Sequence, residues 1–527
     1  MKKSLLIFFA TLKINFLFSQ TLSVDFSSTD TVANMSGSSF GGMNATDPPD
    51  SLIVPLNLAY WRGWPDWTLY NRATSSTIGA KYIILVSDFY GYPRDFYGSQ
   101  QTWTPPYNDT TAYKANIDSL CTLSMGSPMI YDIWNEPDLA DYWAGTQAQF
   151  FSVFKLAHDR IRQKLGYNVK ISGPSLSNYD TTYVRAFCNY CLGNNIQLDV
   201  LSFHWDWNYK PDTLSQFLIW CRTNFINNPT YTSLQIKKII VNEVTGDWTQ
   251  YRPGLNLANY YNLEKGKADG ACRSCWLAQD GSGTDNCVNN TLLGLLTPGS
   301  FEKRANWWAM KSYAELDSIR YTVNSSNPYV YSMTGKLRSS PNTIRAVIGY
   351  YQGVINLQPV TPFLPVNLTI TLNNLNLLAN FSSTDSILVT LYEIPNTEFS
   401  PLSQPNYLGQ YTLANNTSSI TLPLVPLDTN AVIYADIVST GNITTALNKP
   451  TLKNNITFYP NPANTTLFIS GIDNSKEFKI EIYNPTGQIL CNSNNKTSVD
   501  ISLLKTGTYF LKIRQGNETH LQKFIKE

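Results

Sequence analysis

Apolar runs alternate with amphipathic helical patterns over residues 38–320, and this alternation limits the possible folds more than any other feature of the chain. Strands that alternate with helices are typical of parallel sheets with helical crossovers. Eight such strands are expected to close into a (β/α)₈ barrel, the TIM barrel, with functional residues at the carboxyl ends of the strands. The predicted strands are Phe40–Met43, Leu58–Arg62, Tyr82–Val86, Met129–Trp134, Val169–Ser172, Val200–His204, Ile239–Asn242 and Gly270–Arg273.

The helical pattern stops near residue 320, and short alternating strands follow it. Such strands predict an all-β sandwich over residues 321–444. The catalytic barrel is assigned to residues 21–320, with residues 21–30 as a candidate extra strand of the sandwich. The helices predicted between the barrel strands include 146–165, 213–226 and 303–317.

Residues 1–20 have the pattern of an export signal peptide. Lys2 and Lys3 precede an apolar stretch, and we expect cleavage near Ser19 or Gln20. Lys13 interrupts the apolar run, which argues against a membrane span. Because no later segment has about 18 uninterrupted apolar residues, the mature chain is expected to be soluble and to have no transmembrane segment.

The last part of the chain reads as a linker over residues 445–453 and a compact β module over residues 454–527. The module contains Tyr-Pro-Asn-Pro at 459–462 and Thr-Gly-Thr-Tyr at 506–509, with a turn at 485–487. In these motifs it resembles the type A sorting domain that directs Bacteroidetes proteins through the type IX secretion system. The resemblance implies the type IX secretion machinery as a partner and export to the cell surface or the medium. A small β-sandwich for binding or spacing is the alternative.

Composition argues against two classes of partner. The formal charge is +1 and charged residues make up 15% of the chain, so no electrostatic attraction to nucleic acid or to an anionic membrane is expected. Aromatic residues make up 13%, including 13 Trp and 32 Tyr. This content suits stacking on sugar rings, and it is also common in large β-rich secreted proteins.

Export permits disulfide bonds among the eight cysteines. A bond from Cys272 or Cys275 to Cys287 would close a glycine-rich loop. The pairs at 188/191 and 272/275 could alternatively form a four-cysteine zinc site, although their separation is unlike the compact spacing of zinc ribbons. No metal and no cofactor is required by the rest of the sequence.

The motif that carries chemistry is Trp134-Asn135-Glu136-Pro137, at the end of the fourth predicted strand. A carboxyl group at this position can donate a proton to a glycosidic oxygen, and Asn135 can hydrogen-bond a sugar 2-hydroxyl. Pro137 cannot continue a strand ladder and therefore ends the strand. The alternative is an ordinary turn at the end of a strand.

Glycoside hydrolysis with retention needs a second carboxylate about 5–5.5 Å from the first. Glu243 ends the seventh predicted strand, whose carboxyl end faces that of the fourth strand across the barrel mouth. Asp206, Asp247 and Asp280 are rivals, but each lies further into a loop. We therefore predict Glu136 and Glu243 as the catalytic pair.

Five more residues are predicted to bind substrate or support the nucleophile. Arg62 ends the second strand and would keep a nucleophilic carboxylate ionised. His204 ends the sixth strand, between the strands that carry the two glutamates. Trp205, with Trp207, could line the mouth, and Trp276 could form a floor under the bound sugar.

Taken together, Arg62, Asn135, Glu136, His204, Glu243 and Trp276 resemble the retaining (β/α)₈-barrel hydrolases of clan A, most closely the β-xylosidase/α-L-iduronidase family. The resemblance implies that Glu136 is the acid/base and Glu243 the nucleophile. Three features depart from the family pattern: Trp205 stands where tyrosines are usual, Ser87-Asp88 stands where relatives often have a histidine, and Val-Asn-Glu replaces Thr-Glu before the nucleophile. These departures put the substrate in doubt more than the mechanism.

The sequence therefore predicts a secreted or cell-surface glycosidase that hydrolyses plant or algal polysaccharides or oligosaccharides by double displacement. One alternative is an endo-acting glucanase or mannanase-like enzyme of the same clan. Another is an inactive carbohydrate-binding surface protein, which would be expected to lack one of the two carboxyl groups.

Overall fold

The computed structural model describes residues 20–94, 103–206, 211–352, 365–382, 384–415, 417–422, 425–440, 457–472, 474–484, 489–515 and 518–527. Four sequence predictions lie outside these residues: the signal peptide up to residue 19, Trp207, the linker 445–453 and the turn 485–487. The chain divides into two compact units, residues 1–442 and residues 443–527.

Eight parallel strands form the barrel sheet, and each one pairs with the next along the chain. The last strand lies against the first, where the Ser39 hydroxyl donates to the carbonyl of Arg273 at 2.7 Å. The predicted (β/α)₈ fold class is confirmed. The strands are β2 (Gly37–Ser39), β3 (Tyr60–Gly63), β4 (Lys81–Leu85), β5 (Ile130–Asp132), β6 (Lys170–Leu176), β7 (Val200–Trp205), β8 (Lys238–Val244) and β9 (Gly270–Arg273).

The first strand was predicted at Phe40–Met43, which is wrong by three residues, because β2 is Gly37–Ser39. At Gly37 a β-carbon would lie 1.9 Å from the carbonyl oxygen of Ala271 on β9. Only glycine permits this approach of the two backbones. The first strand is therefore set by a backbone contact with β9 and does not need an apolar run.

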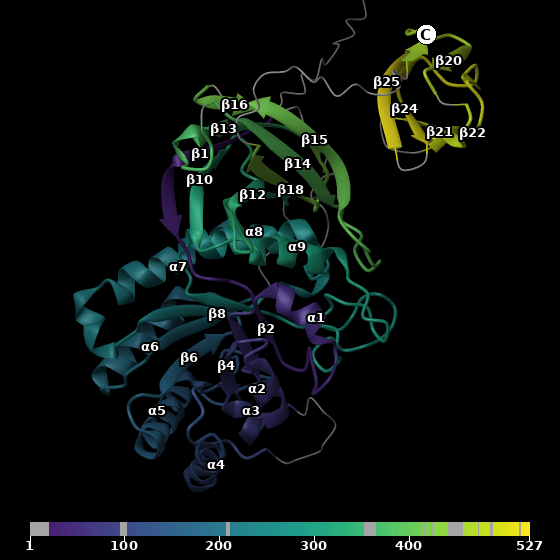
Figure 1. The fold of residues 1–527 in the computed structure, drawn as a ribbon. Coiled ribbons are helices and arrows are strands. Elements are labelled where there is room, and N and C mark those ends of the chain that lie inside the picture. Colours follow the sequence, from purple (N-terminus) through teal and green to yellow (C-terminus); the bar gives the residue numbers. More distant parts are fainter. Residues whose placement is uncertain are drawn as a thin grey trace, which may run out of the picture. The chain divides into compact units, whose positions relative to one another are not determined.

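The helices that connect the strands lie on the outside of the barrel (Figure 1). The helix predicted at 146–165 is α5, Gln147–Leu165. It begins with a capping box between Thr146 and Gln149 and ends at Gly166, which has a positive φ. The others are α1 (Asp50–Ile53), α2 (Trp67–Ala73), α3 (Ser87–Tyr90), α4 (Thr110–Leu123), α6 (Thr181–Gly193), α7 (Pro211–Cys221, continued by a π-helical turn to Ile226), α8 (Pro253–Lys265) and α9 (Ala305–Ala314).

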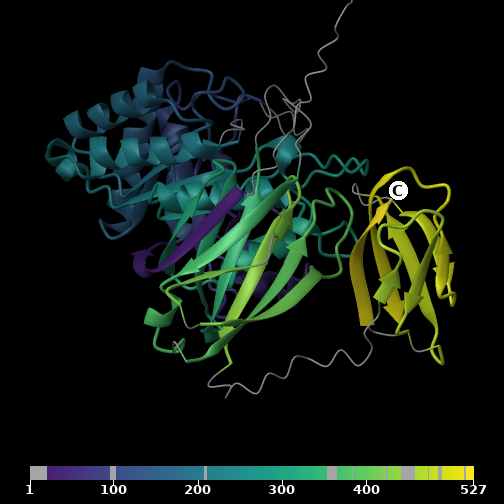
Figure 2. The ribbon, with the colours of Figure 1, turned by 90° about the horizontal axis from the view of Figure 1, so that it is seen from above.

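A ten-stranded sheet forms the sandwich, which packs on α8 and α9 of the barrel (Figure 1). Strand β1 (Gln20–Thr31) pairs with β10 and β13, so the segment that precedes the barrel in sequence is part of the sandwich (purple among the green strands in Figure 2). The remaining strands are β10 (Ile319–Ser325), β11 (Val330–Leu337), β12 (Ser340–Tyr350), β13 (Val366–Asn373), β14 (Ser386–Ile394), β15 (Asn406–Ala414), β16 (Ser419–Thr421), β17 (Val425–Leu427) and β18 (Val432–Ser439).

The second unit is a small β module with its own apolar core, which includes Leu467, Ile480, Leu511 and Phe524. Two sheets of three and four strands enclose this core. Among the described residues, no helix is both long enough and apolar enough to cross a bilayer. The strands are β19 (Thr457–Tyr459), β20 (Thr466–Ser470), β21 (Phe478–Tyr483), β22 (Ile489–Asn494), β23 (Ser498–Asp500), β24 (Gly507–Gln515) and β25 (Glu518–Lys526).

Candidate active site

Arg62 on β3 connects three acidic or amide side chains at the carboxyl end of the barrel. Its Nε donates to Asp132 at 2.8 Å, its Nη1 to Glu243 at 2.5 Å and its Nη2 to Asn135 at 2.7 Å. The side chains of Arg62 and Asp132 are fully buried. The adjacent carboxylates raise the pKa of the Arg62 guanidinium, so this group remains a permanent cation within the site.

Asp132, Ser175 and Asn242 form a buried network beneath the predicted catalytic residues. The Asp132 carboxylate accepts from Ser175 Oγ at 2.5 Å and from Asn242 Nδ2 at 2.8 Å, and Asn242 Nδ2 also donates to Ser175 Oγ. The sequence predictions missed all three residues. Asp132 and Asn242 lie within predicted strands, but only the side-by-side packing of β5, β6 and β8 shows that the three side chains meet.

Glu136 follows β5 with a φ of 46°, a left-handed backbone conformation, and its amide donates to the carbonyl of Ser175 at 2.9 Å. The preceding residue, Asn135, is held by Ser87, whose hydroxyl accepts a hydrogen bond from the Asn135 amide at 3.1 Å. Burial and, to a smaller degree, the charge of Asp138 raise the pKa of Glu136 to about 8. Arg62 acts in the opposite direction but does not overcome burial, so this carboxyl group keeps its proton at neutral pH.

Glu243 lies next to the end of β8 in a different electrostatic environment. Burial raises the pKa of its carboxyl group, and the charge and hydrogen bond of Arg62 oppose that shift without overcoming it. The 2.5 Å ion pair with the permanent cation of Arg62 favours the ionised form. Among the described residues, no lysine or arginine lies within ion-pair distance of Glu136, whereas Glu243 is in contact with the Arg62 guanidinium.

His204 on β7 connects these two carboxyl groups. Its Nδ1 is 2.9 Å from Glu136 Oε1, and its Nε2 is 3.8 Å from Glu243 Oε1. Burial lowers the pKa of the ring to about 4, so the imidazole is neutral at pH 7. Both carboxyl groups thus approach the same ring, each at a different nitrogen.

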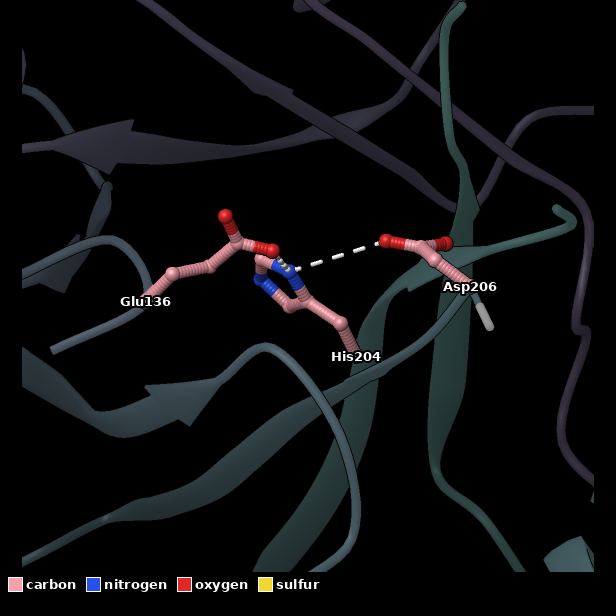
Figure 3. Close-up of side chains that lie close together, drawn as sticks. All are labelled: Glu136, His204 and Asp206. Carbon is pink, nitrogen blue, oxygen red and sulfur yellow. Dashed lines mark hydrogen bonds and ion pairs between the residues drawn. The ribbon is translucent and has the colours of Figure 1, made fainter. Parts of the chain in front are cut away.

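Asp206 is a third buried carboxyl group at this position, and its Oδ2 is 3.8 Å from His204 Nδ1 (Figure 3). Its other oxygen accepts a hydrogen bond from Ser274. Burial and the neighbouring Glu243 raise the pKa of Asp206. The sequence identified Asp206 only as a rival for the nucleophile.

Within the described part of the chain, one group of side chains has the composition and spacing to bind a metal ion. It consists of Glu136, His204 and Asp206, whose possible ligand atoms lie within 4.8 Å of one another. Within this group, His204 Nδ1 is hydrogen-bonded to Glu136. Asp206 is in turn held by Ser274.

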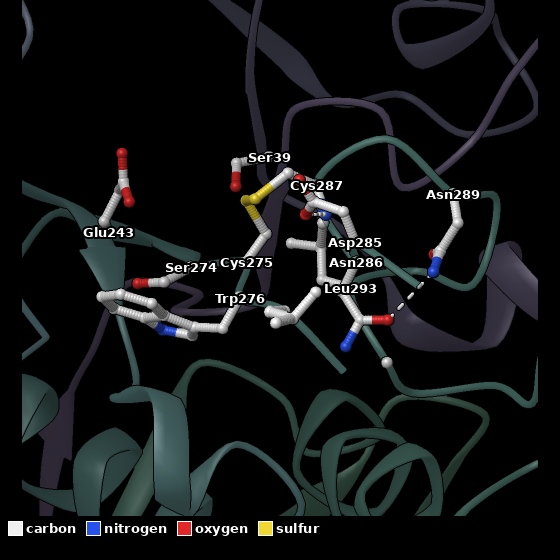
Figure 4. The surroundings of a disulfide bond; sticks show 12 residues. Ser39, Glu243, Ser274, Cys275, Trp276, Asp285, Asn286, Cys287, Asn289 and Leu293 are labelled. Atoms are coloured by element: carbon white, nitrogen blue, oxygen red, sulfur yellow. Dashed lines mark hydrogen bonds between the residues drawn. A yellow bond between two sulfur atoms is a disulfide. The ribbon is translucent and has the colours of Figure 1, made fainter. Parts of the chain in front are cut away.

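Trp276 lies on the loop after β9, where its Nε1 donates to the carbonyl of Thr245 at 2.7 Å. The preceding residue, Cys275, forms a disulfide with Cys287 across 12 residues, which fixes this loop beside Glu243 (Figure 4). The disulfide resolves the two options in favour of Cys275 and makes the four-cysteine zinc hypothesis wrong, because Cys275 is no longer a free thiol. Cys188, Cys191 and Cys272 are buried free thiols.

Trp205, which the sequence predicts to line the mouth, is held by an aromatic neighbour. It is 1% exposed and stacks on Tyr179 with ring centroids 5.2 Å apart, so this face of the indole packs against protein. The other two rival carboxylates are bound elsewhere: Asp280 pairs with Arg304 at 2.5 Å, and Asp247 accepts from Gln279 at 2.7 Å.

Residues 123–245 match the family model described as Glycosyl hydrolases family 39. This range contains Glu136, His204 and Glu243. This part of the barrel is similar to the glycosyl hydrolases of family 39. The protein is therefore a glycoside hydrolase, and the three residues that meet in its barrel all lie within the matched range.

Residues 457–527 match the model described as Secretion system C-terminal sorting domain. The resemblance of this module to a type IX sorting domain is thereby confirmed, and the glycoside hydrolase is a secreted or cell-surface protein.

Solved structures support the same fold. N2152 from Neocallimastix frontalis is 20% identical with a TM-score of 0.61, and the match covers 80% of this chain and 99% of that protein. A monomeric β-xylosidase from Caulobacter crescentus CB15 is 13% identical with a TM-score of 0.56, and the match covers 80% of this chain and 99% of the xylosidase. A bacterial orthologue of human α-L-iduronidase is 12% identical with a TM-score of 0.54, and the match covers 95% of this chain and 99% of that orthologue. At these identities the likeness concerns the fold.

Proposed function

We propose that this glycoside hydrolase cleaves its substrate by double displacement with retention, with Glu136 as acid/base and Glu243 as nucleophile. The observation that supports this most strongly is the contrast between two buried carboxyl groups around one neutral imidazole. Glu136 has a raised pKa of about 8, and Glu243 is paired with Arg62. A proton donor and an ionised nucleophile are what the first step requires.

In the first step, a Glu243 oxygen bonds to the anomeric carbon as the bond to the leaving oxygen breaks, and Glu136 gives that oxygen its proton. In the second step, Glu136 takes a proton from water, the water oxygen bonds to the anomeric carbon, and Glu243 leaves as a carboxylate. In the resting enzyme, the Glu136 O–H donates to His204 Nδ1. This assignment places the ring proton on Nε2, which faces Glu243.

Arg62 and Asn135 prepare the nucleophile and the sugar. Arg62 occupies the Asn135 amide oxygen at 2.7 Å, which leaves the amide nitrogen as the donor for a sugar 2-hydroxyl. A bond to this hydroxyl that strengthens in the transition state contributes several kcal/mol to catalysis. The proposed substrates are plant or algal polysaccharides and the oligosaccharides derived from them, consistent with an exported protein and with β-xylosidase among the proteins of similar fold.

The test is a panel of aryl glycosides and polysaccharides assayed with the purified enzyme and with Glu136→Gln. Loss of the acid should reduce turnover by about 10²–10⁴-fold on substrates with poor leaving groups. The first step should be affected much less on substrates with good leaving groups, because they need little proton donation. The matched control is Glu302→Gln, an exposed glutamate that should leave both activities unchanged. Equal, mild losses on both substrate types would contradict the acid/base assignment.

A further inference from the structure

A cavity of about 620 Å³ lies at the end of the barrel opposite the catalytic residues. The first residues of five consecutive strands line it: Lys81, Ile130, Lys170, Val200 and Lys238. The catalytic residues follow or end the same strands at their carboxyl ends. This cavity, here called the lysine cavity, is therefore separate from the site already described.

The interior wall of the lysine cavity is mainly aliphatic. Ile130 and Val200 belong to an apolar cluster that fills this end of the barrel. The aromatic lining residue is Tyr131, which is fully buried and donates its hydroxyl proton to Ser124. The wall thus suits a hydrocarbon body better than a stacked sugar ring. Its other apolar residues are Met125, Pro128, Met129, Leu165 and Val169.

Five lysines and one carboxylate line the lysine cavity, in a chain whose net charge is only +1. The carboxylate, Asp199, is already bound by Arg162 at 2.7 Å and by Lys170 at 3.0 Å. Lys164 pairs with Asp118 at 3.3 Å. Two of the five lysines are therefore neutralised by carboxylates, and the single lining carboxylate is fully engaged.

The other three lysines are Lys81, Lys237 and Lys238, and the described residues supply none of them with a carboxylate within ion-pair distance. Lys238 Nζ donates to the Tyr60 hydroxyl at 3.0 Å. The ammonium groups of Lys81 and Lys238 lie 5.8 and 5.7 Å from the centroid of the Tyr60 ring. Lysines that line one cavity without carboxylate partners create a positive potential that attracts an anion.

We propose that the lysine cavity binds an amphipathic anion, with its carboxylate or sulfate group among Lys81, Lys237 and Lys238 and its aliphatic body against the apolar wall. The volume falls within the range of about 300–1,000 Å³ that is typical of small-molecule sites. The proposal does not depend on the assignment of the catalytic residues, because it concerns the other end of the barrel.

The test is isothermal titration calorimetry of the full chain with decanoate, decanol and decyltrimethylammonium. Decanoate should bind saturably at one site per chain, at least about tenfold more tightly than decanol, since a charge-assisted contact is worth about that factor. Its affinity should fall as sodium chloride is added, because salt screens exposed lysines. Decyltrimethylammonium should bind more weakly than decanol.

Two variants locate the site. The double variant Lys81→Gln/Lys238→Gln should weaken decanoate binding by about tenfold or more, while Lys114→Gln, an exposed lysine on α4, should not change it. Met125→Glu adds a negative charge at a lining position that is 66% exposed, so it should weaken decanoate binding without affecting folding. Equal affinity for decanoate and decanol, unchanged binding in both variants, or no saturable binding up to about 1 mM would each overturn the proposal.

Discussion

Replacement of Arg62 by methionine tests the electrostatic centre of the site. The change keeps a side chain of similar length but removes the donors to Asp132, Glu243 and Asn135. Asp132 is fully buried and would keep only neutral donors, Ser175 and Asn242. Because Arg62→Met leaves the buried Asp132 carboxylate without its cation, the substitution is expected to reduce the free energy of unfolding of the barrel.

The loss should be about 3–5 kcal/mol, the usual cost of breaking a buried ion pair from one side. Asp132→Asn in the Arg62→Met background removes the uncompensated charge. The double variant should therefore recover about 2 kcal/mol relative to the sum of the two single changes. Activity should also fall, because the charge and hydrogen bond of Arg62 oppose the raised pKa of Glu243.

Urea unfolding followed by tryptophan fluorescence is the assay, since all 13 tryptophans lie between residues 61 and 308, in the barrel region. Arg94→Met is the control: its pair with Asp141 is more than half exposed, and little change is expected. An Arg62→Met variant with wild-type stability, or strict additivity in the double variant, would refute the proposed role of this ion pair.

Three further predictions concern the same site. With the pKa of Glu136 at about 8, kcat/KM should fall as pH rises through about 8, because the acid is active only in its protonated form below that pKa; a profile flat to pH 10 would contradict this. Trp276→Ala should raise KM by about tenfold with a smaller effect on kcat, measured on the best aryl glycoside. Cys275→Ser/Cys287→Ser should lower the free energy of unfolding by about 3 kcal/mol, measured by urea unfolding. The same double variant should also raise KM, as Trp276→Ala does, in steady-state kinetics.

The sequence pattern was sufficient to predict the barrel and the strand ends. Alternation of apolar runs with helices placed Glu136 after β5 and Glu243 near the end of β8, because an apolar run ends where a strand reaches the barrel mouth. The exception was β2, whose short sequence Gly-Ser-Ser has no apolar run. It is defined by a close backbone contact at Gly37, which a pattern of side-chain polarity cannot show.

The contacts within the site could be predicted only in part. Arg62 was expected to support the nucleophile, but its ion pair with Asp132 depends on packing across neighbouring strands. The stacking of Trp205 on Tyr179 also depends on two side chains that meet only in the folded chain. The choice of Cys275 over Cys272 likewise depends on loop geometry, since Cys272 lies buried within β9.

The most direct test of the double-displacement proposal is the product formed by Glu243→Ala in the presence of azide, followed by NMR of the anomeric proton. If Glu243 is the nucleophile, the variant should be nearly inactive on an aryl glycoside, and azide should restore turnover. The product would then be a glycosyl azide of inverted configuration, while the wild-type enzyme gives a retained product. Substantial activity of Glu243→Ala without azide, or an inverted product from the wild-type enzyme, would contradict the proposal.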